Sequence, residues 1–151
     1  MCDKMPGRAL FLGHIADKDV LADLYANADV FIHPNPREPF GIAPLEAMAS
    51  GVPLVAPNRG GVTSYANLEN AWTVSPEVDS YAVAVGEVVT NPAMVAAKAL
   101  KAIEAARQFG WATAAASFLE LYEQLKRLEG MSRGSPRPRS VRPRRAAFRL
   151  R

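Results

Sequence analysis

The fold of this 151-residue chain is decided by the stretch Arg37-Glu38-Pro39-Phe40-Gly41-Ile42-Ala43-Pro44-Leu45-Glu46-Ala47-Met48-Ala49-Ser50-Gly51. A short apolar run at 30–33 precedes it and predicts a buried strand. Two prolines directly after that run end the strand, because proline has no backbone N–H. A helix is expected to start near Ala43, since Pro44 is tolerated in a first turn and Gly51 suits the position just past a last turn. The stretch therefore predicts a strand, an irregular loop and a helix.

The start of this helix is suited to bind a phosphate group. The first N–H groups of a helix have no partners within the helix and lie at the positive end of its dipole. Gly41 has no Cβ, so a ligand can closely approach the amides of Gly41 and Ile42. Glu46, about one turn into the helix, can accept hydrogen bonds from paired hydroxyls such as those of a ribose, and Glu38 faces the group beyond the phosphate. The alternative is that Glu38 and Glu46 are solvated surface acids with a capping role.

Strands and helices alternate along the rest of the chain. Apolar runs predict strands at 9–13, 30–33, 53–56 and 72–74. Periodicity and capping residues predict helices at 18–27, 43–50, 91–108 and 111–128, another ending at Thr90 after a cap at Asp79 or Ser80, and a helical turn near 62–67. This order predicts an α/β fold, a Rossmann-like parallel sheet with helices on both faces and a helical C-terminus. Ligands bind at the carboxyl ends of such strands, so the loops 14–17, 34–42 and 57–61 are expected to converge on one crevice.

Two histidines and a glycine pair near these loops each allow two interpretations. His14 and His33 each follow a predicted strand, and each either lines the crevice or is partly buried with its imidazole bonded to a backbone carbonyl. Two histidines without a nearby cysteine do not predict a metal site. Gly60-Gly61, in the third loop, either contacts the ligand or forms a tight turn.

The charge of the chain is divided between two parts. Residues 1–130 carry 10 basic and 15 acidic side chains, whereas residues 131–151 carry eight arginines and no acid, within an overall charge of +3. We therefore expect a folded domain at 1–130 and a basic, disordered tail at 131–151 that has too few apolar residues to form a core. The tail can attract nucleic acid or acidic lipid. The alternative is a tail without a binding role, so no specific nucleic-acid partner and only weak membrane-surface contact are expected.

Cysteine content and apolar runs indicate a cellular compartment. Cys2 is the only cysteine, so an intramolecular disulfide cannot form, which is typical of a reducing environment. The first residues lack the apolar core of a signal peptide, and no apolar run approaches the ~20 residues of a membrane-spanning helix. We expect a cytoplasmic protein, with any membrane contact peripheral at the inner face.

The central stretch resembles a known family motif. The run from Glu38-Pro39-Phe40-Gly41 to Glu46-Ala47-Met48-Ala49-Ser50-Gly51-Val52-Pro53 is similar to the E-x7-E motif of the retaining glycosyltransferases of family four, which have the two-domain GT-B fold. The flanks at 24–30 and 53–61 agree, and the resemblance covers roughly residues 9–128. It implies that Glu38 is the catalytic residue beside the transferred sugar. It also implies a set of donor-binding residues, namely Phe40, Gly41, Ile42, Glu46, Gly60 and Gly61.

The resemblance implies a retaining hexosyltransferase. Such an enzyme transfers a hexose, mannose or glucose, from a nucleotide-diphosphate sugar to an acceptor, and is expected to need no metal or other cofactor. Family members also have an amino-terminal domain that binds the acceptor, so this chain is expected to be an incomplete C-terminal, donor-binding half. A separate amino-terminal domain or a second copy is the expected partner. The alternative is a truncated, inactive nucleotide-sugar-binding module, or one subunit of a split enzyme.

The last predicted helix carries an apolar stripe at roughly 3.5-residue spacing, formed by Trp111, Ala115, Phe118, Tyr122 and Leu125. In the family that this chain resembles, the final helix typically crosses back onto the amino-terminal domain. Part of the stripe is therefore expected to be exposed as an interface. The alternative is that the stripe packs on the chain's own sheet.

Overall fold

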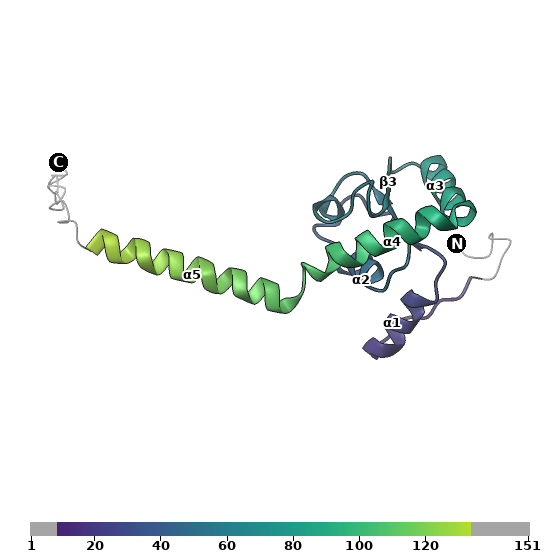
Figure 1. Cartoon of the computed structure of the whole chain (residues 1–151). Helices are drawn as coiled ribbons and strands as arrows, with labels where there is room; N and C mark the ends of the chain where they lie inside the picture. The colour runs from purple at the N-terminus through teal and green to yellow at the C-terminus, as the bar shows by residue number, and fades with distance from the viewer. Residues whose placement is uncertain (1–8, 134–151) are drawn as a thin grey trace, which may run out of the picture. The chain divides into compact units, whose positions relative to one another are not determined.

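The computed structural model describes residues 9–133. The chain divides into two units, residues 1–110 and residues 111–151, and each is described by itself. The first unit contains a parallel sheet and the helices α1 to α4, whereas the second contains helix α5, labelled in Figure 1.

A three-stranded parallel sheet forms the centre of the first unit. Its strands are β1 (Phe31–Ile32), β2 (Leu54–Pro57) and β3 (Trp72–Val74), in the order β1-β2-β3. Phe31 pairs with Leu54, and Val55 pairs in turn with Trp72. All four residues of β2 are buried, as expected for the central strand of a sheet that is covered on both faces. These strands confirm three of the four that the sequence predicts.

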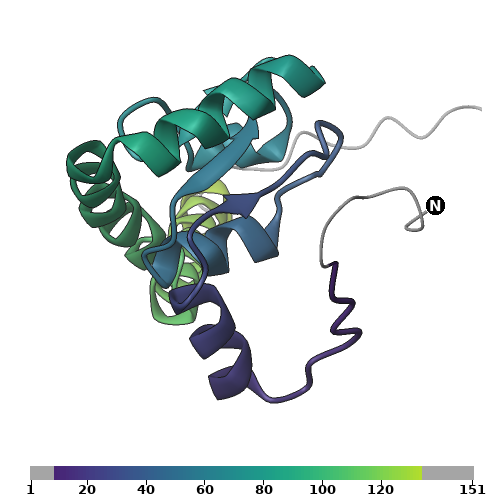
Figure 2. The ribbon, with the colours of Figure 1, turned by 90° about the vertical axis from the view of Figure 1, so that its right-hand side faces the viewer.

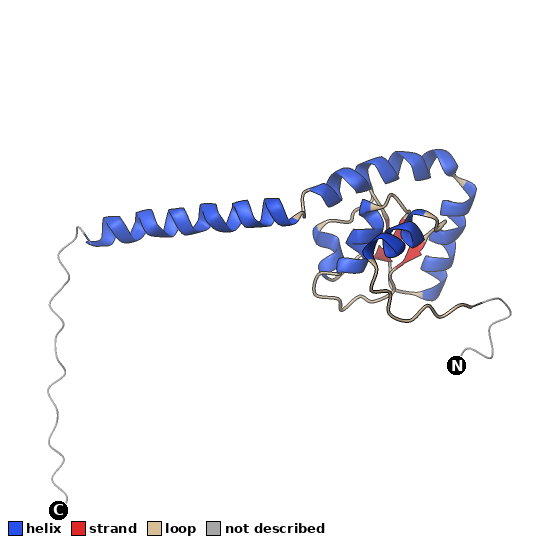
Figure 3. Cartoon of the chain, turned by 90° about the horizontal axis from the view of Figure 1, so that it is seen from below, coloured by secondary structure: helices blue, strands red, loops and turns tan. Residues whose placement is uncertain are grey.

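Helices cover both faces of the sheet, as Figure 3 shows. On one face, Leu54 and Ala56 pack with Met48 of α2 (Ile42–Ala49) and with residues of α4 (Pro92–Arg107). On the other face, Val55 packs with Ala84 and other residues of α3 (Val78–Thr90). The alternation follows from strand geometry, since successive side chains point to opposite faces. The predicted α/β class with helices on both faces is confirmed.

Helix α2 begins and ends as the sequence predicts. Pro44 lies in its first turn, where proline removes no intrahelical hydrogen bond. At the other end, Gly51 has a φ of 80° and donates its N–H to Met48 O at 3.1 Å, while Val52 donates to Ala47 O at 3.3 Å. These two bonds are the Schellman arrangement, in which a left-handed glycine satisfies the last carbonyls of a helix. The deciding stretch is thus a strand, a loop and a helix with defined ends.

The remaining helices of the first unit differ from the predictions mainly at their ends. Helix α1 (Lys18–Ala26) has the predicted N-cap, Asp17, whose carboxylate accepts the N–H groups of Asp19 at 2.9 Å and Val20 at 3.3 Å. No residue of α1 falls in the buried class. Helix α3 starts after Glu77 rather than after Asp79 or Ser80, and the predicted helical turn is a 3₁₀ helix, η2 (Gly61–Ser64).

The strand predicted at 9–13 is wrong. This segment has no strand structure, and the side chains of Leu10 and Phe11 are 81% and 75% exposed. Figure 2 shows the segment before α1 running apart from the strands. A strand forms only where a neighbouring strand satisfies its backbone N–H and C=O groups, and an apolar run alone supplies no such neighbour.

Helix α5 (Trp111–Arg133) makes up the described part of the second unit and runs five residues past its predicted end at Leu128. Large apolar side chains of α5 are exposed, among them Trp111, Phe118, Tyr122 and Leu125. The tail predicted at 131–151 begins inside this helix, and its residues 134–151 lie outside the described part of the chain. Within 9–133, no single helix meets the length and hydropathy expected of a membrane span, and α3 and α4 meet it only as a pair bent by 103°.

Candidate functional site

The loop between β1 and α2 carries the first predicted site residue, Glu38, and is held by its own side chains. Asn35 Oδ1 accepts the N–H of Arg37 at 3.0 Å, which forms a tight turn. Asn35 Nδ2 donates to Glu38 Oε2 at 3.1 Å. Glu38 is partly exposed, and one oxygen of its carboxylate is engaged by Asn35.

The glycine pair holds this loop through backbone contact. The N–H of Gly61 donates to Glu38 O at 2.9 Å. A Cβ on Gly61 would lie 1.9 Å from Pro39 O, and a Cβ on Gly60 would lie 2.7 Å from Pro36 O. Only residues without a side chain allow two backbone segments to come this close. Two of the three predicted loops, 34–42 and 57–61, therefore converge as expected.

Tyr65 lies beneath the start of α2 and was missed by the sequence reasoning. Its hydroxyl is 2.9 Å from Phe40 O and 2.6 Å from Gly41 O. Its ring packs against Phe40 at 5.3 Å and Phe109 at 5.8 Å between centroids. Burial, and secondarily the negative charge of Glu38, raise the pKa of Tyr65 to about 12. The only sequence signal was a large aromatic residue within the predicted turn at 62–67.

The first turn of α2 has no side-chain cap; Gly41 itself is buried, and Ile42, the next residue, is exposed. Gly41 is its N-cap, has a φ of 86° and offers no side-chain acceptor to the first N–H groups. A Cβ there would lie 2.8 Å from the hydroxyl oxygen of Tyr65, so glycine is required by space as well as by conformation. The buried side of α2 is formed by Pro44, Ala47 and Met48. Ile42 and Glu46 are exposed and lie one turn apart, so they share the solvent-facing side of the helix.

The two glutamates have different neighbours. Glu46 lines a hollow between α1 and α2 of about 230 Å³, with Lys18, Leu21, Ala22, Tyr25, Ala49 and Ser50. Burial, and then the nearby Glu46 carboxylate, raise the pKa of Tyr25. Glu38 instead lies against Asn35 and influences Tyr65. The structure therefore joins Glu38, Phe40, Gly41, Gly60 and Gly61 in one contact network and places Glu46 with Ile42 on the adjoining helix surface.

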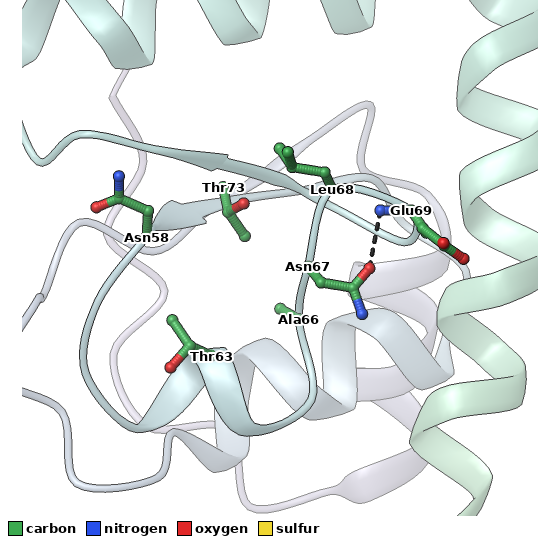
Figure 4. Close-up of a pocket in the computed structure, with 7 residues that line it drawn as sticks. All are labelled: Asn58, Thr63, Ala66, Asn67, Leu68, Glu69 and Thr73. Atoms are coloured by element: carbon green, nitrogen blue, oxygen red, sulfur yellow. Dashed lines mark hydrogen bonds between the residues drawn. The ribbon is translucent and has the colours of Figure 1, made fainter.

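A separate hollow of about 460 Å³ lies beside β3 and η2 and is drawn in Figure 4. Its lining consists of Asn58, Thr63, Ala66, Asn67, Leu68, Glu69 and Thr73. Asn67 Oδ1 accepts the N–H of Glu69 at 2.8 Å across one side of it. It contains none of the predicted site residues, so we do not assign the donor site to it.

The two histidines do not form a common site. His14 is exposed on the segment that fails to form a strand, and within 9–133 no hydrogen bond joins residues 14–17 to the two converging loops. His33 is partly buried at the end of β1, and its carbonyl accepts the hydroxyl of Tyr81 at 3.0 Å. Its Nε2 is buried without a partner among the described residues, so the expected carbonyl partner is not found for that atom. The described residues contain no group of three or more side chains suited to a metal ion.

Sequence comparison relates this chain to known enzymes. Residues 4–109 match the family described as glycosyl transferases group 1. The chain is 36% identical over 136 residues to a glycogen synthase of Mycobacterium tuberculosis, with 85% of this chain and 31% of the relative covered. It is 33% identical over 109 residues to a GDP-mannose-dependent alpha-(1-6)-phosphatidylinositol dimannoside mannosyltransferase of the same species, with 72% and 28% covered. The chain thus spans less than a third of the length of these relatives.

Solved structures show the same fold. Sucrose-phosphate synthase from Thermosynechococcus elongatus superposes with a TM-score of 0.70 and 31% identity, covering 79% of this chain and 30% of that one. The Anabaena protein HepE, crystallised in complex with UDP and glucose, superposes with a TM-score of 0.60 and 26% identity, covering 66% and 28%. The parallel sheet with helices on both faces therefore corresponds to part of a GT-B fold.

Proposed function

Because this chain belongs to the glycosyl transferases group 1 family, we propose that it supplies the nucleotide-sugar-binding part of a retaining glycosyltransferase of the E-x7-E type. The transferred group is a hexose, mannose or glucose, and the donor is a nucleotide-diphosphate sugar. The acceptor is chosen by parts of the protein that lie outside this chain. The proposal covers donor binding by the chain itself and transfer by the whole protein.

The observation that carries this proposal is the backbone at the start of α2. Gly41 leaves the first turn without a side-chain cap, and the N–H groups of a first turn point out of the helix. Glu38 lies in the loop before this turn, and Glu46 lies on its exposed side one turn further on. A diphosphate bound at the amides of Gly41 and Ile42 would then place the ribose toward Glu46 and the transferred sugar toward Glu38.

The chemistry proposed follows from that arrangement. Breaking the bond between sugar and phosphate leaves negative charge on the departing nucleotide diphosphate. Backbone N–H groups and the positive end of a helix dipole stabilise such charge in the transition state, so no metal is required by this scheme. Glu46 would accept hydrogen bonds from the ribose hydroxyls. Glu38 would orient the sugar and steady the positive charge that develops at its anomeric carbon.

Donor binding is tested by calorimetry on this chain with UDP, GDP, UDP-glucose and GDP-mannose. We expect Glu46→Ala to weaken nucleotide binding by roughly 10- to 150-fold, because a hydrogen bond to a charged group contributes about 1.5–3 kcal/mol. Glu104→Ala is the matched control, since Glu104 is an exposed carboxylate on α4. Glu38→Ala should keep the affinity for the free nucleotide and lose the added affinity of the sugar. Equal nucleotide affinity in Glu46→Ala and the unchanged chain would contradict the assigned role.

A second candidate is a binding module that transfers nothing. Under this alternative the chain binds nucleotide sugar, or pairs with a separate acceptor-binding domain, without supporting turnover. Release of nucleotide from the donor, measured with and without such a domain, distinguishes the enzyme from the binding module. Only the enzyme hypothesis predicts a release that depends on Glu38.

A further inference from the structure

The hydroxyl of Tyr65 meets the two peptide units that open α2. It lies 2.9 Å from the carbonyl oxygen of Phe40 and 2.6 Å from that of Gly41. Each carbonyl shares its peptide unit with the N–H of the next residue, so these units carry the N–H groups of Gly41 and Ile42. We propose that Tyr65 is a positioning residue: its single O–H proton, shared between the two carbonyl oxygens, orients and polarises these peptide units so that their N–H groups hold a nucleoside diphosphate. This inference rests on the proposed function, in which those amides bind the donor.

The two peptide units need such a restraint. Gly41 has a φ of 86°, and glycine samples both signs of φ at little cost, so the sequence alone does not fix the planes on either side of it. Its N-cap position also lacks the side-chain hydrogen bond that fixes most helix starts. The Tyr65 hydroxyl restrains the same two peptide units instead, through their carbonyl oxygens. Because donation to a carbonyl increases the polarisation of its peptide unit, it also makes the attached N–H a stronger donor.

Tyr65 is itself held firmly enough to act in this way. It is 5% exposed, and its carbonyl accepts Asn70 Nδ2 at 2.9 Å. Its ring contacts Phe40 at 5.3 Å and Phe109 at 5.8 Å between centroids. The phenol is protonated at neutral pH, as tyrosine ordinarily is, and its pKa of about 12 widens that margin, so the hydroxyl remains a donor beside an anionic ligand. A phenolate at this place would instead repel both carbonyl oxygens.

The orienting role is tested in the ligand-free chain by amide NMR spectra of Tyr65→Phe. This change keeps the ring and removes only the hydroxyl. We expect the largest amide shift changes outside residues 64–66 to fall on Gly41 and Ile42. Tyr81→Phe is the matched control, because Tyr81 also donates its hydroxyl to a backbone carbonyl, that of His33 at 3.0 Å. It should leave Gly41 and Ile42 unchanged. Unchanged Gly41 and Ile42 signals in Tyr65→Phe would overturn the proposal.

The phosphate-holding role is tested by comparing UDP with uridine. We expect Tyr65→Phe to bind UDP about fivefold more weakly, the loss that follows if the misplaced amides forfeit about one hydrogen bond of average net strength to the phosphate. Uridine affinity should not change, because uridine has no phosphate. A merely structural role would weaken both ligands equally, so equal losses, or no loss with UDP, would overturn the inference. If the unchanged chain binds neither UDP nor GDP, the proposed function fails with the diphosphate role, and the ligand-free spectra still decide whether Tyr65 orients the two peptide units.

Discussion

Replacing Gly61 by alanine is the most direct perturbation of the candidate site. A Cβ on Gly61 would lie 1.9 Å from Pro39 O, 2.3 Å from Pro39 C and 2.6 Å from Phe40 N. These three atoms are backbone, so no side-chain rotation can relieve the clash. Ordinary contact begins near 3.4 Å, so the loop that carries Glu38 must move by about 1.5 Å.

The cost of that movement can be worked out from its parts. Overpacking of this kind costs about 1–3 kcal/mol. Moving the loop also breaks the hydrogen bond from Gly61 N to Glu38 O, worth about 1 kcal/mol net. Gly61 does not have a positive φ, so alanine adds no left-handed strain and recovers less than about 1 kcal/mol of unfolded-state entropy. We expect a net loss of about 3 kcal/mol, which for a unit of this size lowers Tm by on the order of 15 °C.

Urea unfolding followed by circular dichroism measures this loss. Gly86→Ala is the matched control, because Gly86 lies inside α3 and a Cβ there meets nothing within 4 Å. Alanine is the better helix former, so the control should be more stable by about 0.5–1 kcal/mol. A Gly61→Ala chain as stable as the unchanged one, with the amide signals of Arg37, Glu38 and Phe40 in place, would refute the close approach of the two loops.

Three further predictions concern stability. Folding raises the pKa of Tyr65 to about 12, whereas tyrosines of the unfolded chain titrate near pH 10, so the folded chain holds the phenol proton more tightly. The stability that this difference contributes is fully present below pH 10 and is lost as the pH rises from 10 to 12. Urea unfolding at pH 9 and near pH 12 should therefore show a decline larger in the unchanged chain than in Tyr65→Phe by about 2 kcal/mol, and equal declines would contradict this. Met48 of α2 is fully buried against the sheet, so Met48→Ala should lower the free energy of unfolding by about 2–5 kcal/mol, measured from the urea midpoint. A loss well under 1 kcal/mol would show that the core is not packed there. Asp17→Ala removes the cap of α1 and should cost about 1 kcal/mol, seen as faster hydrogen exchange in α1 with β2 unchanged; uniform exchange changes would argue against a local cap.

Local sequence patterns predicted elements correctly wherever the local signal also had a partner in the fold. The apolar run around Val55 became the central strand because both neighbours are present. The run around Phe11 has a similar composition and formed no strand, because hydrophobic pattern does not report whether a neighbouring strand exists. The end of α2 was predictable from Gly51 alone, since the C-terminal motif is local.

The candidate site likewise contains residues that local sequence rules place and one, Tyr65, that they do not. Glu38, Gly41 and Glu46 lie within one strand-loop-helix unit, so their placement around the helix start follows from local rules. Tyr65 reaches Gly41 across 24 residues of sequence. No local sequence pattern predicts the partners of its hydroxyl, because the carbonyls that it contacts depend on how η2 packs beneath α2. Contacts of this kind are the part that sequence reasoning does not supply.

The glycine pair shows how this affects the interpretation of function. Its polar groups are largely engaged within the protein: Gly61 N–H donates to Glu38 O, Gly60 O accepts the Thr63 hydroxyl at 2.8 Å, and Gly61 O accepts the Ser64 hydroxyl at 2.7 Å. Donor contact by the pair stays a prediction, and these bonds favour the N–H of Gly60 as the group that would make it. Any side chain added at Gly61 would move the loop of Glu38 first. Loss of donor binding in a Gly61 variant would therefore measure the position of Glu38, not a missing glycine contact.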